Sequence, residues 1–195
     1  ANIGDVISGS VDYYKSISMN AYNFWYLVLD GDLFYRKDDV VFAMGLTYKT
    51  WGLLLFLASA TLVCTPLLLT LIKEKLKKTT QPLSMESAAL AMALVVMCFF
   101  FFNTQMHERY IHPVIVFSTW LAFRYKQWMQ WIVISLAYAL SLEKVCKLLE
   151  LNNYGTLVFH EKFLAGLYLI GFLLLALRYI KVVLSTSVAE HFVAE

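Results

Sequence analysis

Polar and ionisable residues concentrate in one short stretch of the sequence, from Asn103 to Pro113. The stretch follows a run of four phenylalanines and holds two histidines, a glutamate, an arginine and two side-chain amides. Ionisable groups at the edge of an apolar segment are costly unless they are paired or hydrated, which makes them functional candidates by default. The candidates for substrate binding in this stretch are Gln105, His107, Glu108, Arg109, Tyr110 and His112.

These residue types favour an anionic ligand over a metal ion. Arginine presents a planar fork of donors and keeps its charge, which suits a phosphate or pyrophosphate at the level of the lipid headgroups. Glu108 would hold the guanidinium of Arg109, and the histidines would donate to phosphate oxygens. His107 and His112 lie five positions apart and have no cysteine beside them, so we predict no metal site. The alternative is that the groups cap a helix and reach water by snorkelling.

The backbone of this stretch is expected to form a polar hairpin at the outer membrane surface. On a helix, Gln105 and Arg109 would share one face, and so would Glu108 and His112. A residue before proline is pushed towards an extended conformation, so the helix is expected to end at His112. Pro113 then suits the first turn of the next helix.

The composition predicts that these side chains belong to a membrane protein. Of the 195 residues, 60% are hydrophobic and 15% charged, and the mean hydropathy is +0.63. A soluble domain is nearer to about 45–50% apolar and about 25% charged. The net charge of +2 and the lack of a long basic tract predict no nucleic-acid partner. The three cysteines form no CxxC pair, so we interpret them as packing residues.

Five apolar stretches predict an all-α integral membrane protein, a bundle of about five transmembrane helices with an N-terminal external amphipathic segment. A helix crosses ~30 Å of hydrocarbon with about 20 apolar residues. The predicted spans are residues 50–72, 87–103, 113–124, 128–143 and 163–184. The third is short for a full crossing, so a broken or re-entrant helix is the alternative there.

The remaining segments are assigned to the two sides of the membrane. Residues 1–48 contain no long apolar run and are placed outside the hydrocarbon, with Ser10 to Leu29 as an amphipathic or interfacial helix. Short lysine-rich turns favour the cytoplasmic side. The lysines after the first span therefore place residues 1–48 and 143–162 on the external face and the tail 186–195 in the cytoplasm. Residues 143–162 are expected to form a solvated connector.

Three short segments resemble the motifs of one family of membrane enzymes. Residues 104–110, TQMHERY, resemble the MHERY signature of bacterial integral-membrane glycosyltransferases of the GT-C superfamily, relatives of the polyprenyl-phosphate-mannose-dependent mannosyltransferases. Residues 19–25, MNAYNFW, are similar to the NAYNLW segment of that family, and residues 47–52, TYKTWG, to the SYRTWG that opens its following span. The order and spacing of the three segments agree with the family, and the resemblance covers most of residues 10–180.

The resemblance implies a transferase that takes a sugar from a lipid-phosphate donor at the external face of a bacterial inner membrane. The residues that match its motifs would serve binding: Arg109, His107 and Glu108 near the donor phosphate, and Asn20, Asn23 and Trp25 on the sugar or acceptor side. Amides and an aromatic ring suit a sugar through hydrogen bonds and stacking. An interfacial aromatic belt is the alternative for residues 20–25. No cofactor is expected, although relatives differ in their use of a divalent cation.

This chain differs from the family in one respect that bears on function. Family members are longer and carry a catalytic aspartate upstream of the Asn-Trp segment. Asp5 and Asp12 follow no transmembrane helix, so neither is assigned as the base and the catalytic residue stays unknown. The chain is expected to be the C-terminal half of the enzyme, with membrane lipids, the sugar donor and a second chain or larger complex as partners. The alternative is a non-catalytic membrane subunit that binds a lipid headgroup or a partner protein.

Overall fold

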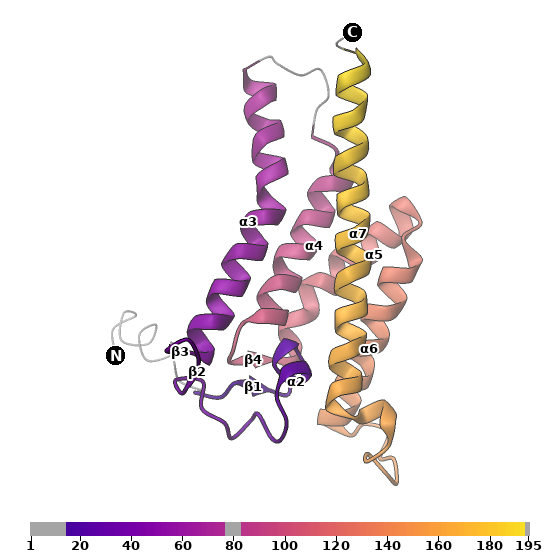
Figure 1. Ribbon diagram of the computed structural model, residues 1–195. Helices are drawn as coiled ribbons and strands as arrows, with labels where there is room; N and C mark the ends of the chain where they lie inside the picture. Colours follow the sequence, from indigo (N-terminus) through magenta and orange to yellow (C-terminus); the bar gives the residue numbers. More distant parts are fainter. Residues whose placement is uncertain (1–14, 77–82, 194–195) are drawn as a thin grey trace, which may run out of the picture.

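The computed structural model describes residues 15–76 and 83–193, and for residues 186–193 it describes the helical backbone alone. Within these ranges, long helices form a bundle with short extended segments at one end (Figure 1). The long helices are α3 (Tyr48–Lys75), α4 (Met85–Phe102), α5 (His112–Tyr125), α6 (Trp128–Cys146) and α7 (Glu161–Val193). The short elements are β1 (Ser18–Met19), α2 (Phe24–Val28), β2 (Val41–Ala43), β3 (Leu46–Thr47), β4 (Met106–His107) and the 3-10 helices η1 (Glu108–Ile111) and η2 (Leu157–Phe159).

Four of the described helices are long and apolar enough to cross a membrane, which confirms an all-α membrane bundle. They are α3, α4, α6 and the part of α7 up to Ser185. The helix α5 corresponds to the short third span of the sequence prediction. Its 14 residues reach about 21 Å at 1.5 Å per residue, less than the ~30 Å of hydrocarbon. It returns the chain from the end of α4 to the start of α6 (Figure 1).

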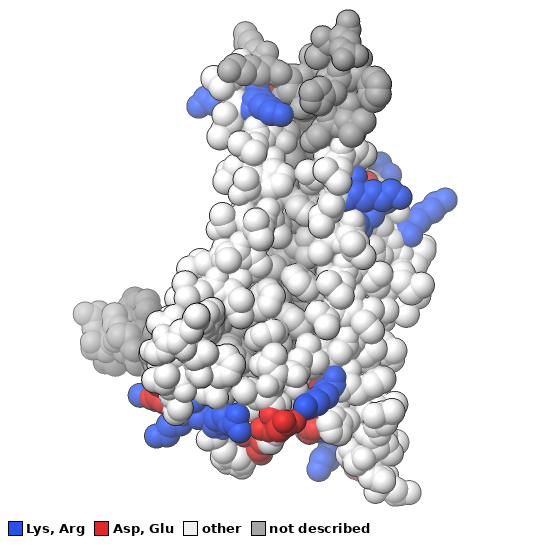
Figure 2. Space-filling model, viewed as in Figure 1, with Lys and Arg blue, Asp and Glu red and all other residues white. Residues whose placement is uncertain are grey.

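The helices alternate in direction, so their connections gather at two ends of the bundle (Figure 1). We call the end with residues 15–47, 103–111 and 147–160 the loop end. The opposite end, which we call the turn end, holds the last turn of α3, the first turn of α4 and the turn between α5 and α6. On the face shown in Figure 2, charged side chains gather at the two ends and leave a broad uncharged band between them. This distribution is expected where a bundle crosses hydrocarbon.

Capping residues fix where the helices begin. The hydroxyl of Thr47 accepts a hydrogen bond from the N–H of Thr50 at 3.2 Å and caps α3. The hydroxyl of Ser84 accepts from the N–H of Ser87 at 3.0 Å and caps α4 in the same way. Pro113 lies in the first turn of α5, as predicted, where its missing N–H has no cost.

Two local predictions from the sequence are wrong. In the described part of the expected helix from Ser10 to Leu29, residues 15–23 are extended or irregular and only α2 is helical. The pairing of β1 with β4 overrides the local pattern there. His112, expected to be extended, is helical with φ −47° and ψ −47°. The 3-10 helix η1 leads directly into α5, and this continuous turn outweighs the preference of a residue before proline.

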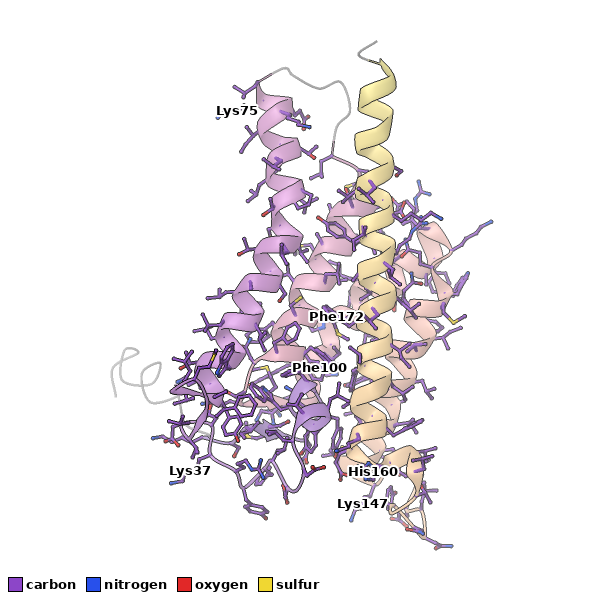
Figure 3. The ribbon with its side chains drawn as sticks, in the orientation of Figure 1. Lys37, Lys75, Phe100, Lys147, His160 and Phe172 are labelled. Atoms are coloured by element: carbon purple, nitrogen blue, oxygen red, sulfur yellow. The ribbon has the colours of Figure 1, made fainter. Side chains whose placement is uncertain are left out.

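The core lies between α4 and α7, where aromatic rings pack together. Phe101 stacks on Phe172 with ring centroids 5.6 Å apart, and Phe100 meets Tyr168 edge-on at 5.0 Å. Figure 3 labels Phe100 and Phe172 in this region of the bundle. Lipid tails are as apolar as these rings, so close packing is what holds the helices together inside a membrane.

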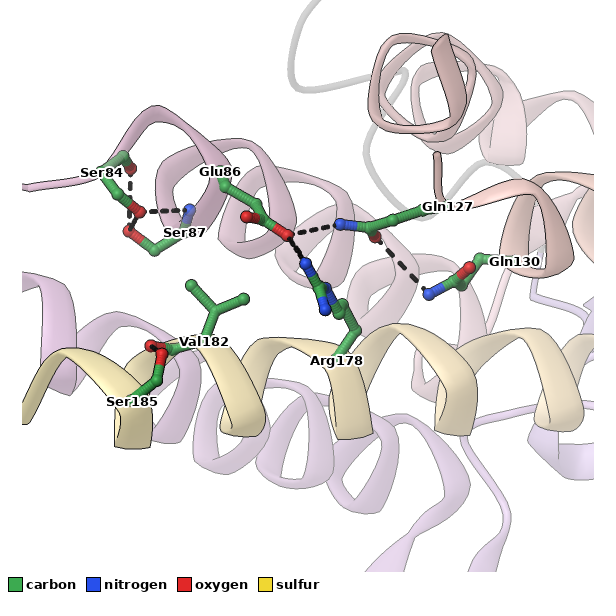
Figure 4. A network of polar contacts seen from close by, with 8 residues as sticks. All are labelled: Ser84, Glu86, Ser87, Gln127, Gln130, Arg178, Val182 and Ser185. Carbon is green, nitrogen blue, oxygen red and sulfur yellow. Dashed lines mark hydrogen bonds and ion pairs between the residues drawn. The ribbon is translucent and has the colours of Figure 1, made fainter. Parts of the chain in front are cut away.

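A partly buried ion pair joins the helices at the turn end (Figure 4). Glu86, in the first turn of α4, accepts through Oε1 from the amide of Gln127 at 2.7 Å and from Nε of Arg178 at 2.9 Å. Gln127 lies between α5 and α6, and Arg178 lies in α7. One carboxylate therefore connects α4, α7 and the turn between α5 and α6. Charges at this depth are stable only while they are paired.

Replacing Glu86 with alanine is expected to lower the free energy of unfolding by about 1–3 kcal/mol, because Arg178 and Gln127 lose their shared acceptor. Thermal unfolding in detergent micelles measures the loss. Glu74→Ala is the matched control, since it removes an exposed carboxylate from α3 at the same end and should stay within about 0.5 kcal/mol of the wild type. Equal stability of the two variants would contradict a structural role for the ion pair.

Candidate functional site

The structure brings the segment around Asn20 against the segment around His107. Strand β1 pairs in parallel with β4, with Ser18 opposite Met106 and Met19 opposite His107. An antiparallel bridge then joins Asn20 to His107. Two of the three segments that resemble the glycosyltransferase family, separated by about eighty residues in the sequence, are thus neighbours at the loop end.

Asn23 and Trp25 hold the last turn of α4. The side-chain amide of Asn23 donates to the carbonyls of Phe100 at 3.2 Å and Asn103 at 3.0 Å. The indole N–H of Trp25 donates to the carbonyl of Phe102 at 2.9 Å. The last carbonyls of a helix have no partner within it, and both donors are fully buried beside them. This corrects the sequence interpretation, because Asn23 and Trp25 support the site from inside and do not line a surface.

The third segment, residues 47–52, meets the same turn of α4. The ring of Tyr48 packs edge-on against Trp25 with centroids 5.5 Å apart. Gly52 passes so close that an added Cβ would lie 2.8 Å from the carbonyl oxygen of Phe102. All three family-like segments therefore converge on the C-terminal end of α4.

Asp38 fixes the start of the polar stretch. Its carboxylate is buried and accepts through Oδ2 from the hydroxyl of Thr104 at 2.8 Å and from the amide of Gln105 at 2.9 Å. Gln105 is thereby held in place by the protein itself. Sequence reasoning missed Asp38, since nothing in the pattern distinguishes it from the neighbouring Asp39.

Residues 107–112, predicted to belong to a polar hairpin with helical face-sharing, form a compact turn without an α-helix before His112. After β4, the 3-10 helix η1 replaces an α-helix, so the expected face shared by Gln105 and Arg109 does not form. The Nδ1 atom of His107 lies 3.9 Å from a carboxylate oxygen of Glu108. Arg109 is exposed, and so are the two other candidates in the turn, Tyr110 and His112.

Both histidines of the stretch have aromatic neighbours. The ring of His107 meets Tyr110 edge-on with centroids 5.5 Å apart. His112 bonds through Nε2 with the hydroxyl of Tyr138 on α6. Burial lowers the pKa of His107, the charge of Arg109 acts in the same direction, and Glu108 opposes them. His107 is therefore a neutral hydrogen-bonding group at neutral pH.

A polar pocket of about 340 Å³ lies at the loop end. Asn20 connects it to this turn, because Asn20 lines the pocket and its backbone is bridged to His107. The polar lining of the pocket comes from the N-terminal segment (Asn20, Tyr22, Tyr26, Asp30 and Asp32) and from the ends of α6 and α7 (Lys144, His160, Glu161 and Lys162). Figure 3 labels His160 at the foot of α7. The segment 143–162, expected to be a solvated connector, thus contributes four of the polar residues that line the pocket.

Both lysines of the pocket are paired with carboxylates, and Asp32 is a further carboxylate in the lining. Lys144 pairs with Glu161 and lies over the ring of Tyr22, 5.0 Å from its centroid. Lys162 lies 2.6 Å from Oδ1 of Asp30, and this bond holds the pKa of Asp30 below its ordinary value. Burial, followed by the neighbouring Tyr26 and carboxylates, raises the pKa of Tyr22. The pocket therefore offers neutral phenols, two lysine–carboxylate pairs and the carboxylate of Asp32. Sequence reasoning placed Lys144, Glu161 and Lys162 in a solvated connector and missed these pairs, because only the fold brings the end of α6, the start of α7 and Asp30 together.

Part of the strained backbone of the described residues lies where the segments meet. Asn20, Tyr22 and Gln105 have φ values of 62°, 40° and 60°, in the left-handed region that non-glycine residues rarely adopt. Such conformations persist only where the surrounding structure enforces them, and they cluster at functional sites. Here the strand pairing and the bonds to Asp38 enforce them.

The fold and the site together define a multi-pass α-helical membrane protein with a polar, partly strained pocket at one end of its bundle. Among the described residues, no three histidine, cysteine or acidic side chains are grouped to hold a metal ion. Comparison with models of protein families, with curated proteins and with solved structures gives no match to this chain.

Gly52→Ala is expected to destabilise the protein by about 1–3 kcal/mol, because its Cβ would overlap the carbonyl of Phe102 and push α3 away from α4. Gly166→Ala is the matched control, since it adds the same methyl group within α7 where no atom lies within 4 Å. The control should be neutral or more stable by up to about 1 kcal/mol, from helix propensity. Unfolding in detergent compares the two variants, and a harmless Gly52→Ala would contradict the close approach.

The lowered pKa of His107 predicts a loss of stability in acid. The unfolded chain takes up a proton near pH 6.5, whereas the folded protein resists it, so stability falls as the pH drops below 6.5. The slope for one group cannot exceed about 1.4 kcal/mol per pH unit. His107→Gln should remove this component, which is measured as the difference between the unfolding curves of variant and wild type from pH 7.5 to 5. Identical pH dependence of the two would contradict the prediction.

Proposed function

We propose that this chain is the C-terminal part of a membrane glycosyltransferase that moves a sugar, mannose or another hexose, from a polyprenyl-phosphate donor to an acceptor at the external membrane face. The observation that carries the proposal is the convergence of residues 19–25, 47–52 and 104–110 on the end of α4. These are the segments on which the resemblance to the family rests. Their meeting in space is what a shared site requires.

The loop end has an exposed arginine beside a pocket whose lysines are paired, and this distribution of charge fits a sugar carried on a lipid phosphate. Arg109 is exposed beside His107 at the end of the apolar bundle, the level at which a lipid phosphate lies. The pocket next to it has its lysines neutralised by Glu161 and Asp30, so it favours an uncharged, hydroxyl-rich group over a free anion. Its volume of about 340 Å³ falls within the roughly 300–1,000 Å³ of small-ligand sites.

In this proposal the sugar lies in the pocket and the phosphate lies against Arg109. The acceptor hydroxyl attacks the anomeric carbon, and the bond from that carbon to the phosphate oxygen breaks. The lipid phosphate leaves, and the configuration of the anomeric carbon is inverted. Arg109 stabilises the charge that develops on the leaving phosphate. Asn20, which borders both the pocket and the turn, hydrogen-bonds the sugar. The general base is not assigned to any described residue.

Arg109→Ala is expected to weaken binding of a polyprenyl-phosphate-mannose roughly tenfold or more, the value of a charge-assisted contact. Binding is measured by thermal shift of the protein in lipid nanodiscs. Arg124→Ala, which removes an exposed arginine at the turn end, is the control and should bind as the wild type does. The uncharged polyprenol is the control ligand and should bind equally to the wild type and to both variants. Equal donor binding by Arg109→Ala and wild type would refute this role of Arg109.

The alternative, a non-catalytic subunit that binds a lipid headgroup or a partner, is favoured by the internally paired charges of the pocket. Radiolabelled sugar transfer from the same donor, assayed in membranes that hold the full native complex, separates the two. Sugar transfer by the wild type that is lost in Arg109→Ala supports the glycosyltransferase function. Donor binding that depends on Arg109 without any transfer supports the subunit.

A further inference from the structure

An apolar crevice of about 400 Å³ lies between α3 and α7, far along the bundle from the loop end, with α4 at its floor. Its walls include Leu62 and Pro66 on α3 and Ala176 and Val183 on α7. Figure 1 shows α3 standing apart from α7. The most apolar stretch of α3, 18 residues long, has none of its residues buried in the protein. The helix is therefore incompletely packed on this side.

The two hydroxyl groups that line the crevice are already bonded within the protein. Ser59 donates to the carbonyl of Leu55 at 2.7 Å, and Tyr179 donates to the carbonyl of Val63 at 2.6 Å. Pro66 lacks the N–H that would bond the carbonyl of Leu62, and the hydroxyl of Tyr179 bonds the carbonyl of the adjacent Val63. A space without free polar groups does not hold ordered water. Inside hydrocarbon, its natural occupant is a lipid chain.

Basic residues lie at the turn end of α3, and one of them is on the face that lines the crevice. With about 3.6 residues per turn, Lys73 falls on the face that Leu62 and Pro66 present to the crevice. Lys75, also in the last turn, lies on the opposite side of the helix and adds positive charge at the same level. Residues 73–78 contain four lysines and one glutamate. Lysine clusters next to a membrane span attract anionic lipid headgroups.

We propose that the crevice binds one chain of an anionic phospholipid from the leaflet at the turn end, with the lipid phosphate at Lys73 and with Lys75 adding to the positive charge at that level. The bound chain fills the space between α3 and α7 and completes the packing of α3. This site lies at the opposite end of the bundle from the polar pocket, and its ligand is a structural lipid. It is therefore independent of the proposed sugar transfer.

Native mass spectrometry of the protein released from nanodiscs of equimolar phosphatidylglycerol and phosphatidylcholine tests the headgroup contact. The wild type is expected to retain phosphatidylglycerol preferentially, and Lys73→Gln with Lys75→Gln should reduce that preference roughly tenfold. Arg124→Gln with Lys181→Gln makes the same charge change at the same end, away from the crevice, and should keep the preference. Absence of retained lipid or of any preference in the wild type, or equal loss in the control pair, would overturn the proposal.

A second pair of variants tests the chain contact. Ala176→Trp fills the crevice and is expected to lower retention of both lipids several-fold, whereas Leu177→Trp adds its ring on the exposed neighbouring position and should not. Equal retention by the two variants would overturn the chain site. If Ala176→Trp does not fold, Ala176→Leu replaces it, and the exposed lysine pair decides the headgroup contact in either case.

Discussion

The hydrogen bonds from Asn23 and Trp25 to the last carbonyls of α4 are the interactions on which the loop end depends. A helix that ends at a membrane boundary leaves carbonyl groups that neither lipid nor the helix can satisfy, and exposing them costs free energy. Here buried donors from a segment about eighty residues earlier in the chain bond to Phe100, Phe102 and Asn103. The same bonds place β1 beside β4, so the contacts that satisfy the last carbonyls of α4 also build the site.

This constraint explains the unusual backbone around the site. To reach α4 and pair with β4, the chain turns sharply at Asn20 and Tyr22, and Gln105 turns in the same left-handed sense. The buried carboxylate of Asp38 compensates by bonding Thr104 and Gln105. The strained residues Asn20 and Tyr22 line the pocket, whereas Arg109 is exposed in the turn beside it.

The sequence predicts the class of the protein well because hydropathy and length decide where helices cross a membrane. It also places Arg109 at the loop end, since ionisable groups mark the ends of apolar runs. It does not predict the roles of Asn23 and Trp25, whose partners are backbone carbonyls distant in the chain. The helix expected from Ser10 fails, in its described part, for a similar reason, because strand pairing outweighs local propensity.

The polar pocket lies beyond sequence reasoning for a different reason. Lys144 and Lys162 have the pattern of solvated loop residues, and only the fold brings them to Glu161 and Asp30. These pairs join the end of α6, the start of α7 and the N-terminal segment. Contacts between segments so far apart in the chain produce no periodic pattern in the sequence.

Disulfide trapping tests most directly whether the separate segments meet at the end of α4. In a chain whose three native cysteines are replaced by alanine, Asn20→Cys with His107→Cys is expected to form a disulfide in membranes under mild oxidation, because bridged residues lie within the geometric range of that bond. Asn20→Cys with Lys126→Cys, at opposite ends of the bundle, should stay reduced. Intact mass and a maleimide shift measure both. Free thiols at positions 20 and 107 under oxidation, each still reactive to maleimide, would contradict the convergence on which the site rests.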